Sequence, residues 1–486
     1  MQDHGGDLSR RYEIEDLPES DTKPGRQARR VMQSYARLFE GKPEGDILRG
    51  LGFFDRPAER EALTLVLRGP LQEAALVKLR KARLILTSDA QAPIDCHPLV
   101  REHFGALTKA SDPEGFRDGH SKLFDHYCQV PEKYQPDTLE ELTPLFHAVA
   151  HGCHAGRHQE ALAKVYFARI TRGNEAYLNK KLGANGIDLS LLAHFFEETW
   201  GRPVQTLIPA AQVWMINNAA FALRALGRLA DAVEPMRAGA QDDAARQDWT
   251  NAAIDYGNLS ELLLILGHIE EAVAVARQSV DYANRSGDRF QRLGKRTALA
   301  DALHQSGNRA EAARLFAEAE SIQKEDQPDY PVLYSLRGYL YCDLLLAQGY
   351  NAEALRRATQ TITIAERNNW LLDIGLDHLT LGRAHAPGST ESCHHLDQAV
   401  TYLRRAGTTH MLPLALLARA TDADLAEVHK IATRSGMRLH LTDYHLAMAR
   451  RHRSLEHLEK AEKLIHETGY HRRDQEAAAL RAELQS

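Results

Sequence analysis

The sequence contains little cysteine, and no stretch of it approaches the roughly 20 uninterrupted apolar residues that a membrane-spanning helix requires. Residues 1–30 also lack the apolar segment of a secretory signal peptide. The five cysteines form none of the CxxC pairs typical of zinc and redox sites; they are Cys96, Cys128, Cys153, Cys342 and Cys393. These absences predict a cytoplasmic protein with reduced thiols and no membrane partner.

The chain also lacks a large excess of charge of either sign. It carries 60 basic and 66 acidic residues, which gives a formal net charge of −6. Proteins dedicated to nucleic acids usually have an excess of Lys and Arg, so nucleic acid is not the expected partner. A hydrophobic content of 43% supplies a substantial core, and 486 residues suffice for about three domains.

Sequence signatures of catalysis are missing as well. There is no P-loop GxxxxGK[ST], no GxSxG elbow, no HExxH and no GxGxxG. The dipeptide Gly294-Lys295 lacks the upstream glycine of a P-loop. We therefore expect no catalytic residues, no cofactor and no enzymatic activity from the chain alone.

The 24 histidines raise the question of a metal site, and the densest group is His151, Cys153, His154 and His158. His154 and His158 are spaced i, i+4, which can place two ligands on one face of a helix. However, Gly156 lies between them at an expected helix end, and no second pair with ligand spacing accompanies them. We therefore expect no metal site.

What the sequence does contain is a repeat of about forty residues. Segments 217–236, 257–276, 297–316 and 339–358 share a helical apolar pattern, a glycine, a short polar link and a second helix. The aligned glycines, separated by 40, 40 and 42 residues, favour a left-handed cap after the first helix; they are Gly227, Gly267, Gly307 and Gly349. Five residues later comes a small residue, where the two helices must approach closely: Ala232, Ala272, Ala312 or Ala354.

This pattern resembles the tetratricopeptide repeat family. An earlier, degenerate unit with Gly156 and Ala161 occupies 145–168, a long insertion follows it, and a shortened unit is expected at 414–434. The resemblance implies stacked helix pairs that form an α-solenoid with a concave groove. The sequence thus predicts an all-α fold with one small β-hairpin, linking helices over 111–210 and a tetratricopeptide-like superhelix over 211–486.

Amides and carboxylates occupy the positions expected to face the groove. In peptide-binding members of the family, amides such as those of Asn218 and Asn258 would hold the backbone of a ligand; alternatively they hydrogen-bond within or between helices. The carboxylates would suit a basic ligand or form a solvated acidic face. The predicted peptide-binding residues are Asn217, Asn218, Asn258, Glu261, Asp301 and Asp343, with Phe221, His304 and Tyr339 beside them.

Residues 27–110 follow a different plan. The segments ILRGLGFF, PAEREALTLVL and LQEAALVKLRKA predict three short helices, the second opened by Pro57. The run RLILT, the turn SDAQAP and the run IDCH predict a β-hairpin, and Pro98 then opens another helix. Three helices, a hairpin and a helix together predict a winged helix.

This region resembles the part that follows the nucleotide-binding core in STAND-type signalling NTPases, which carry repeat sensors at their C-terminus. The segment CHPLVREHF (96–104) resembles their Met-His-Asp motif, which would place His97 against a phosphate of bound ADP, although Cys96 and Pro98 replace the flanking residues. The alternative is that this imidazole satisfies nearby backbone groups. Residues 1–26 would be a remnant of the NTPase helical region, and a separate P-loop NTPase would be a partner.

Two functions follow as expectations. The favoured one is a non-enzymatic sensor or adaptor of a STAND-type system, whose groove binds a protein or peptide. The alternative is a DNA-binding transcriptional regulator that uses the third helix of the winged helix. The cations of that helix are Lys78, Arg80, Lys81 and Arg83; they alternate with apolar core residues, which favours a solvated basic face instead.

Overall fold

The structure is a computed structural model that describes residues 23–87, 89 and 91–485. The chain divides into two compact units, one up to Arg169 and one from Ile170 onward. Within the described residues the fold is all-α apart from one two-stranded sheet, as the sequence predicts. Most of the segment interpreted as an NTPase remnant, residues 1–22 of 1–26, lies outside the described residues.

The first unit begins with short helices, and prolines open two of them. Pro43 and Pro98 are first residues of their helices, where a missing N–H breaks no helical hydrogen bond. The helices are α1 (Lys23–Leu38), α2 (Pro43–Leu51), α3 (Arg60–Thr64), α4 (Glu73–Lys81) and α5 (Pro98–Ser111).

The extended segments between these helices pair more sparsely than the sequence predicts. Ile85 and Cys96 form an antiparallel bridge in place of a full hairpin, and Ile94 bridges to Ala58. The second bridge explains why α3 begins at Arg60 and not at Pro57, because Ala58 exchanges two backbone hydrogen bonds with Ile94 and is therefore extended. After α1, the observed order is the three helices α2, α3 and α4, then two bridged segments and α5.

The first unit ends with a helix pair that matches the predicted degenerate repeat. A capping box between Thr138 and Glu141 starts α7, and Gly156 follows the end of this helix at φ +77°. Ala161 is fully buried where the next helix packs. The elements are α6 (Pro113–Gln129), α7 (Leu139–His154), α8 (His158–Glu160) and the π-helix η3 (Ala161–Ile170).

The second unit opens with the predicted insertion and continues as helix pairs. The insertion contains η4 (Gly173–Glu175), α9 (Tyr177–Lys180), α10 (Asn185–Ala193) and the hairpin strands β1 (Phe196–Glu198) and β2 (Arg202–Pro203). The regular hairpin of the described chain therefore lies here and not in the region 27–110, for which the sequence predicts a winged helix. We call the first helix of each later pair an inner helix.

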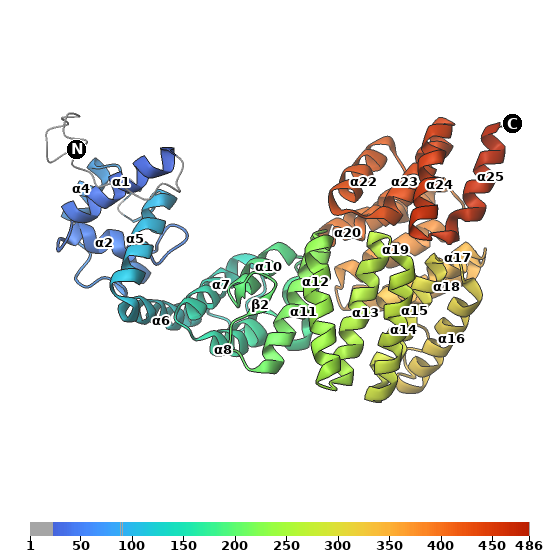
Figure 1. The fold of residues 1–486 in the computed structure, drawn as a ribbon, viewed down its shortest axis with the longest axis horizontal. Coiled ribbons are helices and arrows are strands. Elements are labelled where there is room, and N and C mark those ends of the chain that lie inside the picture. Colours follow the sequence, from blue (N-terminus) through green and yellow to red (C-terminus); the bar gives the residue numbers. More distant parts are fainter. Residues whose placement is uncertain (1–22, 88, 90, 486) are drawn as a thin grey trace. The chain divides into compact units, whose positions relative to one another are not determined.

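Seven helix pairs then follow one another within the described residues, and a last helix completes the chain (Figure 1). They are α11 (Pro209–Ala225) with α12 (Leu229–Ala245), α13 (Trp249–Leu266) with α14 (Ile269–Ser286), α15 (Arg289–Gln305) with α16 (Arg309–Asp326), α17 (Ser335–Ala347) with α18 (Asn351–Arg367), α19 (Leu371–Ala384) with α20 (Thr390–Arg405), α21 (Leu412–Arg419) with α22 (Asp422–Ser435), and α23 (Arg438–His452) with α24 (Leu455–Thr468), then η5 (His471–Arg473) and α25 (Asp474–Gln485). The shortened unit predicted at 414–434 is the pair α21 and α22.

The repeat register is confirmed by backbone geometry. The four aligned glycines follow the first helices with φ of +74°, +87°, +89° and +82°, a conformation that residues with a Cβ rarely adopt. The four alanines five residues later are fully buried. Sequence periodicity therefore identified both the turns and the close helix contacts.

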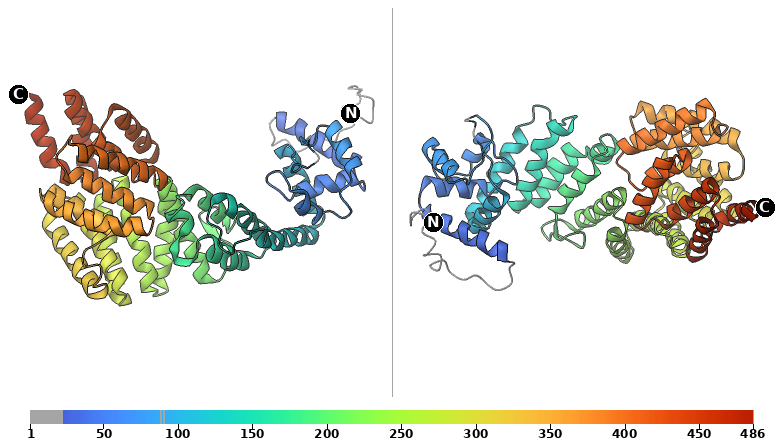
Figure 2. Two further views of the ribbon diagram at one scale, coloured as in Figure 1. Left: turned by 180° about the vertical axis from the view of Figure 1, so that it is seen from behind. Right: turned by 90° about the horizontal axis from the view of Figure 1, so that it is seen from above.

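The superhelix closes on itself within the second unit, which the sequence did not predict. The backbone N–H of Thr409 donates to the carbonyl of Ala225 at 2.6 Å, and α23 packs against α13. A Cβ at Gly307 would lie 3.2 Å from Cβ of His471. The C-terminal helices, orange to red, thus lie beside the first pairs, green to yellow (Figure 2).

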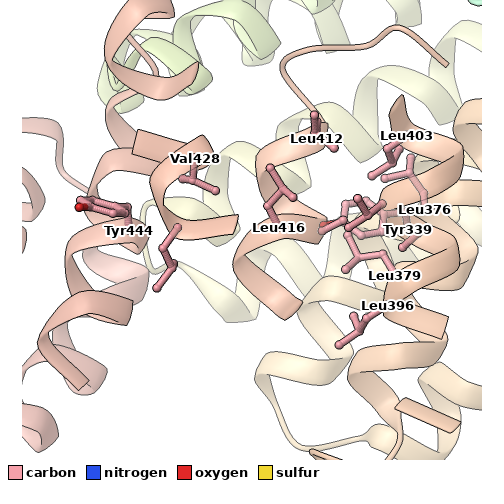
Figure 3. Packing of buried hydrophobic residues seen from close by; sticks show 13 residues of the cluster. Tyr339, Leu376, Leu379, Leu396, Leu403, Leu412, Leu416, Val428 and Tyr444 are labelled. Carbon is pink, nitrogen blue, oxygen red and sulfur yellow. The ribbon is translucent and has the colours of Figure 1, made fainter. Parts of the chain in front are cut away.

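Apolar packing continues through the turn of the superhelix. One buried cluster runs from Tyr339 on α17 through Leu376 and Leu403 to Val428 on α22 and Tyr444 on α23 (Figure 3). It joins four successive pairs, so no pair buries its apolar stripe alone. The inner helices α17, α19, α21 and α23 contribute to this core, and other side chains of the same helices line the site described next.

Candidate ligand-binding site

A pocket of about 290 Å³ lies inside the closed superhelix. The C-terminal halves of α13 and α15, together with α17, form one wall, and α21, α23 and η5 form the other. Its apolar lining includes Leu264, Leu336, Tyr339, Met411, Leu414 and Leu446. Concave pockets with an apolar lining and a few convergent polar groups are the usual form of a ligand site.

Glu261, predicted to bind a ligand, is already paired within the chain. Its Oε2 lies 2.5 Å from Nη1 of Arg224, and both side chains line the pocket. The guanidinium of Arg224 also lies 5.7 Å from the ring centroid of Phe221, which is 37% exposed. We call the three predicted carboxylates, Glu261, Asp301 and Asp343, the acidic column. The first of them is therefore neutralised without a ligand.

Asp343 is neutralised even more completely. Arg472 donates to Oδ2 at 2.5 Å and to Oδ1 at 3.0 Å, and Arg383 donates to Oδ1 at 2.8 Å. Burial opposes ionisation, but the two guanidiniums outweigh it and hold the pKa of Asp343 well below its usual range. Nε2 of His304 lies 3.8 Å from the same carboxylate, and burial, then Arg472, lowers the pKa of His304 to about 3. The basic partner that the sequence led us to expect from a ligand is thus, at Asp343, the side chain of Arg472 in η5.

Asp301 is the carboxylate of the column without an ion pair. It accepts one hydrogen bond, from Nε2 of Gln305 at 2.6 Å, and no cation lies within 4.0 Å among the residues that the structure describes. Burial raises its pKa to about 7, and the negative charge of Asp343 adds to that rise. Tyr339 lies in the same pocket, and burial raises the pKa of its hydroxyl. Among the three predicted carboxylates, Asp301 is therefore the one that remains available to a ligand.

The predicted amides do not line this pocket. Nδ2 of Asn218 donates to the carbonyl of Trp214 at 2.7 Å, a bond within its own helix. Oδ1 of Asn217 lies close to Gly239 of α12, where an added Cβ would be 3.7 Å away. Asn258 is half-buried and makes no side-chain hydrogen bond to any described residue. Of the three asparagines, Asn258 is therefore the one whose side-chain amide is available to hydrogen-bond a ligand.

A second row of charged residues, which we had not predicted, occupies the inner helices. Asp255, Lys295 and Arg337 each lie twelve positions before a capping glycine. Burial raises the pKa of Asp255, and burial lowers the pKa of Lys295 to about 8. The fixed offset from the glycines was a signal that could have identified the row from sequence.

The candidate residues of the first unit serve local structure. Nδ1 of His97 accepts a hydrogen bond from the N–H of Leu99 at 3.2 Å, so its imidazole caps α5. In the third helix, Lys78 lies 2.8 Å from Glu44, and Nε of Arg80 donates to the carbonyl of Thr87 at 2.8 Å. Lys81 and Arg83 are exposed. Only part of the basic face is therefore available to a phosphate backbone.

Several histidines contact one another in the described part of the chain. Nδ1 of His151 lies 2.9 Å from Nδ1 of His120, while Cys153 is buried. Across the described part of the chain, no three His, Cys, Asp or Glu side chains are arranged to hold a metal ion. In the same residues, no helix is long and apolar enough to traverse a bilayer.

Comparisons with known proteins give one likeness to report. No protein-family model and no curated protein matches the chain. Among solved structures, the chain is similar to the crystal structure of a Signal Transduction ATPase with Numerous Domains (STAND) protein with a tetratricopeptide repeat sensor from Pyrococcus horikoshii. The two share 12% identity with a TM-score of 0.41, and the alignment covers 96% of this chain and 68% of that one. No residue assignment rests on this similarity.

Proposed function

We propose that this protein is a non-enzymatic sensor or adaptor whose closed superhelix binds a segment of a protein or a peptide in the inner pocket. The supporting observation is the pocket itself: an apolar lining from two walls of inner helices surrounds Asp301, a buried carboxyl without an ion pair among the described residues. A carboxyl of that kind accepts hydrogen bonds from a ligand amine or amide.

The volume of the pocket limits how much of the ligand it holds. About 290 Å³ is at the lower end of the range for small-molecule sites, and it accommodates one or two side chains or a chain terminus. The rest of a protein ligand would contact the rim. The winged-helix-like first unit would transmit binding to a P-loop NTPase on another chain, as the STAND resemblance implies.

The test uses the full chain and a peptide library displayed on phage. Peptides enriched on the wild-type chain are then measured against Ala447→Trp, which places an indole in the pocket from α23. The matched control is Ala478→Trp on an exposed position of α25. We expect Ala447→Trp to weaken binding at least tenfold and the control to leave it unchanged.

Two results would contradict the proposal. Enriched peptides that bind Ala447→Trp as tightly as the wild type would remove the pocket from the site. Retention of duplex DNA at moderate salt, without retention of any peptide, would favour the DNA-binding alternative, since Lys81 and Arg83 are exposed. Circular dichroism of both tryptophan variants establishes that the helices are intact.

A further inference from the structure

Two cations on neighbouring inner helices have no anionic partner. Lys295 lies on α15 and Arg337 on α17, at equivalent positions of successive repeats. No carboxylate of the described residues lies within 4.0 Å of either, and neither donates a hydrogen bond there. The cations of the adjacent pocket differ in this respect, because Arg224, Arg383 and Arg472 each contact a carboxylate.

Glycines on the preceding inner helices make room for both cations. A Cβ on Gly257 would lie 2.8 Å from Cδ and 2.9 Å from Nζ of Lys295. A Cβ on Gly294 would lie 3.3 Å from Nη2 of Arg337. Each long side chain therefore lies across the backbone of the preceding inner helix. In addition, Cζ of Arg337 lies 4.1 Å from the ring centroid of Phe290. This packing gives both cations defined positions before any ligand arrives.

The carboxyls nearest to these cations do not balance their charge. Glu261 is the closest favourable charge to Lys295, but it is already bonded to Arg224. Burial raises the pKa of Asp255, which reduces its negative charge, whereas Asp373, whose pKa burial raises to about 6, is mainly ionised at pH 7 but lies within 4.0 Å of neither cation. Lys295 is mainly protonated at pH 7, since its pKa lies at about 8. The local field is therefore positive, opposite in sign to that expected from the acidic column.

A neutral donor is next in sequence to the glycine that Lys295 contacts. Asn258 follows Gly257, against which Lys295 lies, and its amide makes no side-chain hydrogen bond to a described residue. An ammonium, a planar guanidinium and an amide together offer donors to several oxygens of one anion. Arg337 can bind two oxygens of an anionic group at once.

We propose that Lys295, Arg337 and Asn258 bind an oxyanion, a carboxylate or a phosphate, carried by the ligand of the inner surface. This proposal rests on the proposed function, because it assigns the charge of that ligand. Lys295 and Asp301 are six residues apart on α15, which is about 9 Å along the helix. A ligand would thus place its anionic group about that far from the group that contacts Asp301.

The test measures the affinity of the full chain for two simple probes, inorganic phosphate by ³¹P NMR and ¹³C-labelled acetate by ¹³C NMR. We expect saturable binding of at least one probe, which identifies the source of the oxyanion. Lys295→Gln and Arg337→Gln should each weaken it at least tenfold. Lys324→Gln, at an exposed position of α16, is the matched control and should not change it.

Thermal unfolding of the same variants separates binding from structure. Cations kept without an anion destabilise the free protein, so both glutamine variants should unfold at the same or a higher temperature than the wild type. Marked loss of stability in both would make the cations structural and overturn the proposal, as would equal affinity of wild type and variants for both probes. Peptide binding that is lost in Ala447→Trp but unchanged in Lys295→Gln would overturn this proposal while leaving the proposed function intact.

Discussion

The guanidinium of Arg472 donates hydrogen bonds of 2.5 and 3.0 Å to the two carboxylate oxygens of Asp343, although 129 residues separate them in the sequence. Both side chains are buried, and Nη1 of Arg472 also donates to Oε1 of Gln305 at 3.0 Å. The contact joins η5 to the inner helices α15 and α17. It therefore fastens the last helix pairs to the middle ones.

Removal of this guanidinium should weaken the second unit considerably. Arg472→Met leaves a buried carboxylate with one cation, and breaking a buried pair of this kind typically costs about 3 kcal/mol of unfolding free energy. Urea unfolding followed by circular dichroism measures the loss. Arg450→Met is the control, because Arg450 is exposed and its bond to Glu476 should contribute less than about 1 kcal/mol. Equal losses in the two variants would contradict a closing role for Arg472.

Substitutions at two capping glycines distinguish the cost of backbone strain from the cost of disturbing the contact with η5. Gly307→Ala and Gly349→Ala both force a Cβ into a left-handed conformation, at φ of +89° and +82°, which costs about 1 kcal/mol. At Gly349 no atom lies within 4 Å of the added Cβ, whereas at Gly307 it meets Cβ of His471 at 3.2 Å. We expect Gly307→Ala to lower the melting temperature more than Gly349→Ala. The reverse order would show that η5 does not press on this turn.

The pocket carboxyl should make stability depend on pH. Burial raises the pKa of Asp301 to about 7, so its contribution is complete below the unfolded pKa, near 3.8, and is lost as the pH rises through about 7. Asp301→Asn removes that loss, and we expect its stability relative to wild type to increase by about 4 kcal/mol from pH 4 to pH 8. Chemical unfolding at several pH values measures this. Asp326→Asn, exposed on α16, is the control, and a constant difference for Asp301→Asn would contradict the shift.

Acid should lower the unfolding free energy through the contact between His378 and His395. Nδ1 of His378 lies 2.9 Å from Nδ1 of His395, so one ring must be a neutral acceptor. Burial, then the charge of His395, lowers the pKa of His378 to about 4, so its contribution is present above pH 6.5 and is lost as the pH falls toward 4. His378→Gln should flatten the pH dependence of the unfolding free energy in that interval. His466→Gln, at an exposed position, should leave it unchanged.

Local chemistry made the repeat predictable from sequence. Gly267 is informative because only a residue without Cβ adopts its φ of +87° readily, and Ala272 because nothing larger fits between the helices. Both constraints act within one helix pair, so they appear at a fixed spacing. The same reasoning identified the cap at Gly156 in the first unit.

The site was less predictable because its contacts are distant in sequence. Asp343 was expected to face a ligand, and no local pattern indicates that Arg472 reaches it from η5. The side chain of Asn218 donates to the carbonyl of Trp214 in its own helix. Sequence spacing alone does not decide whether such an amide bonds within its helix or to a ligand. The hairpin prediction failed for a similar reason: Ile94 bridges to Ala58, which is 36 residues away in the sequence, and only Ile85 and Cys96 bridge within the predicted hairpin.

The contact of the last helices with the first ones changes how the second unit should come apart. An open array of repeats can fray from either end, since each pair depends on its neighbours alone. Here the hydrogen bond between Thr409 and Ala225 joins segments that are far apart along the chain, so early and late repeats stabilise each other. We therefore expect the second unit to unfold in one cooperative step, and during synthesis these contacts form only after the late helices have left the ribosome.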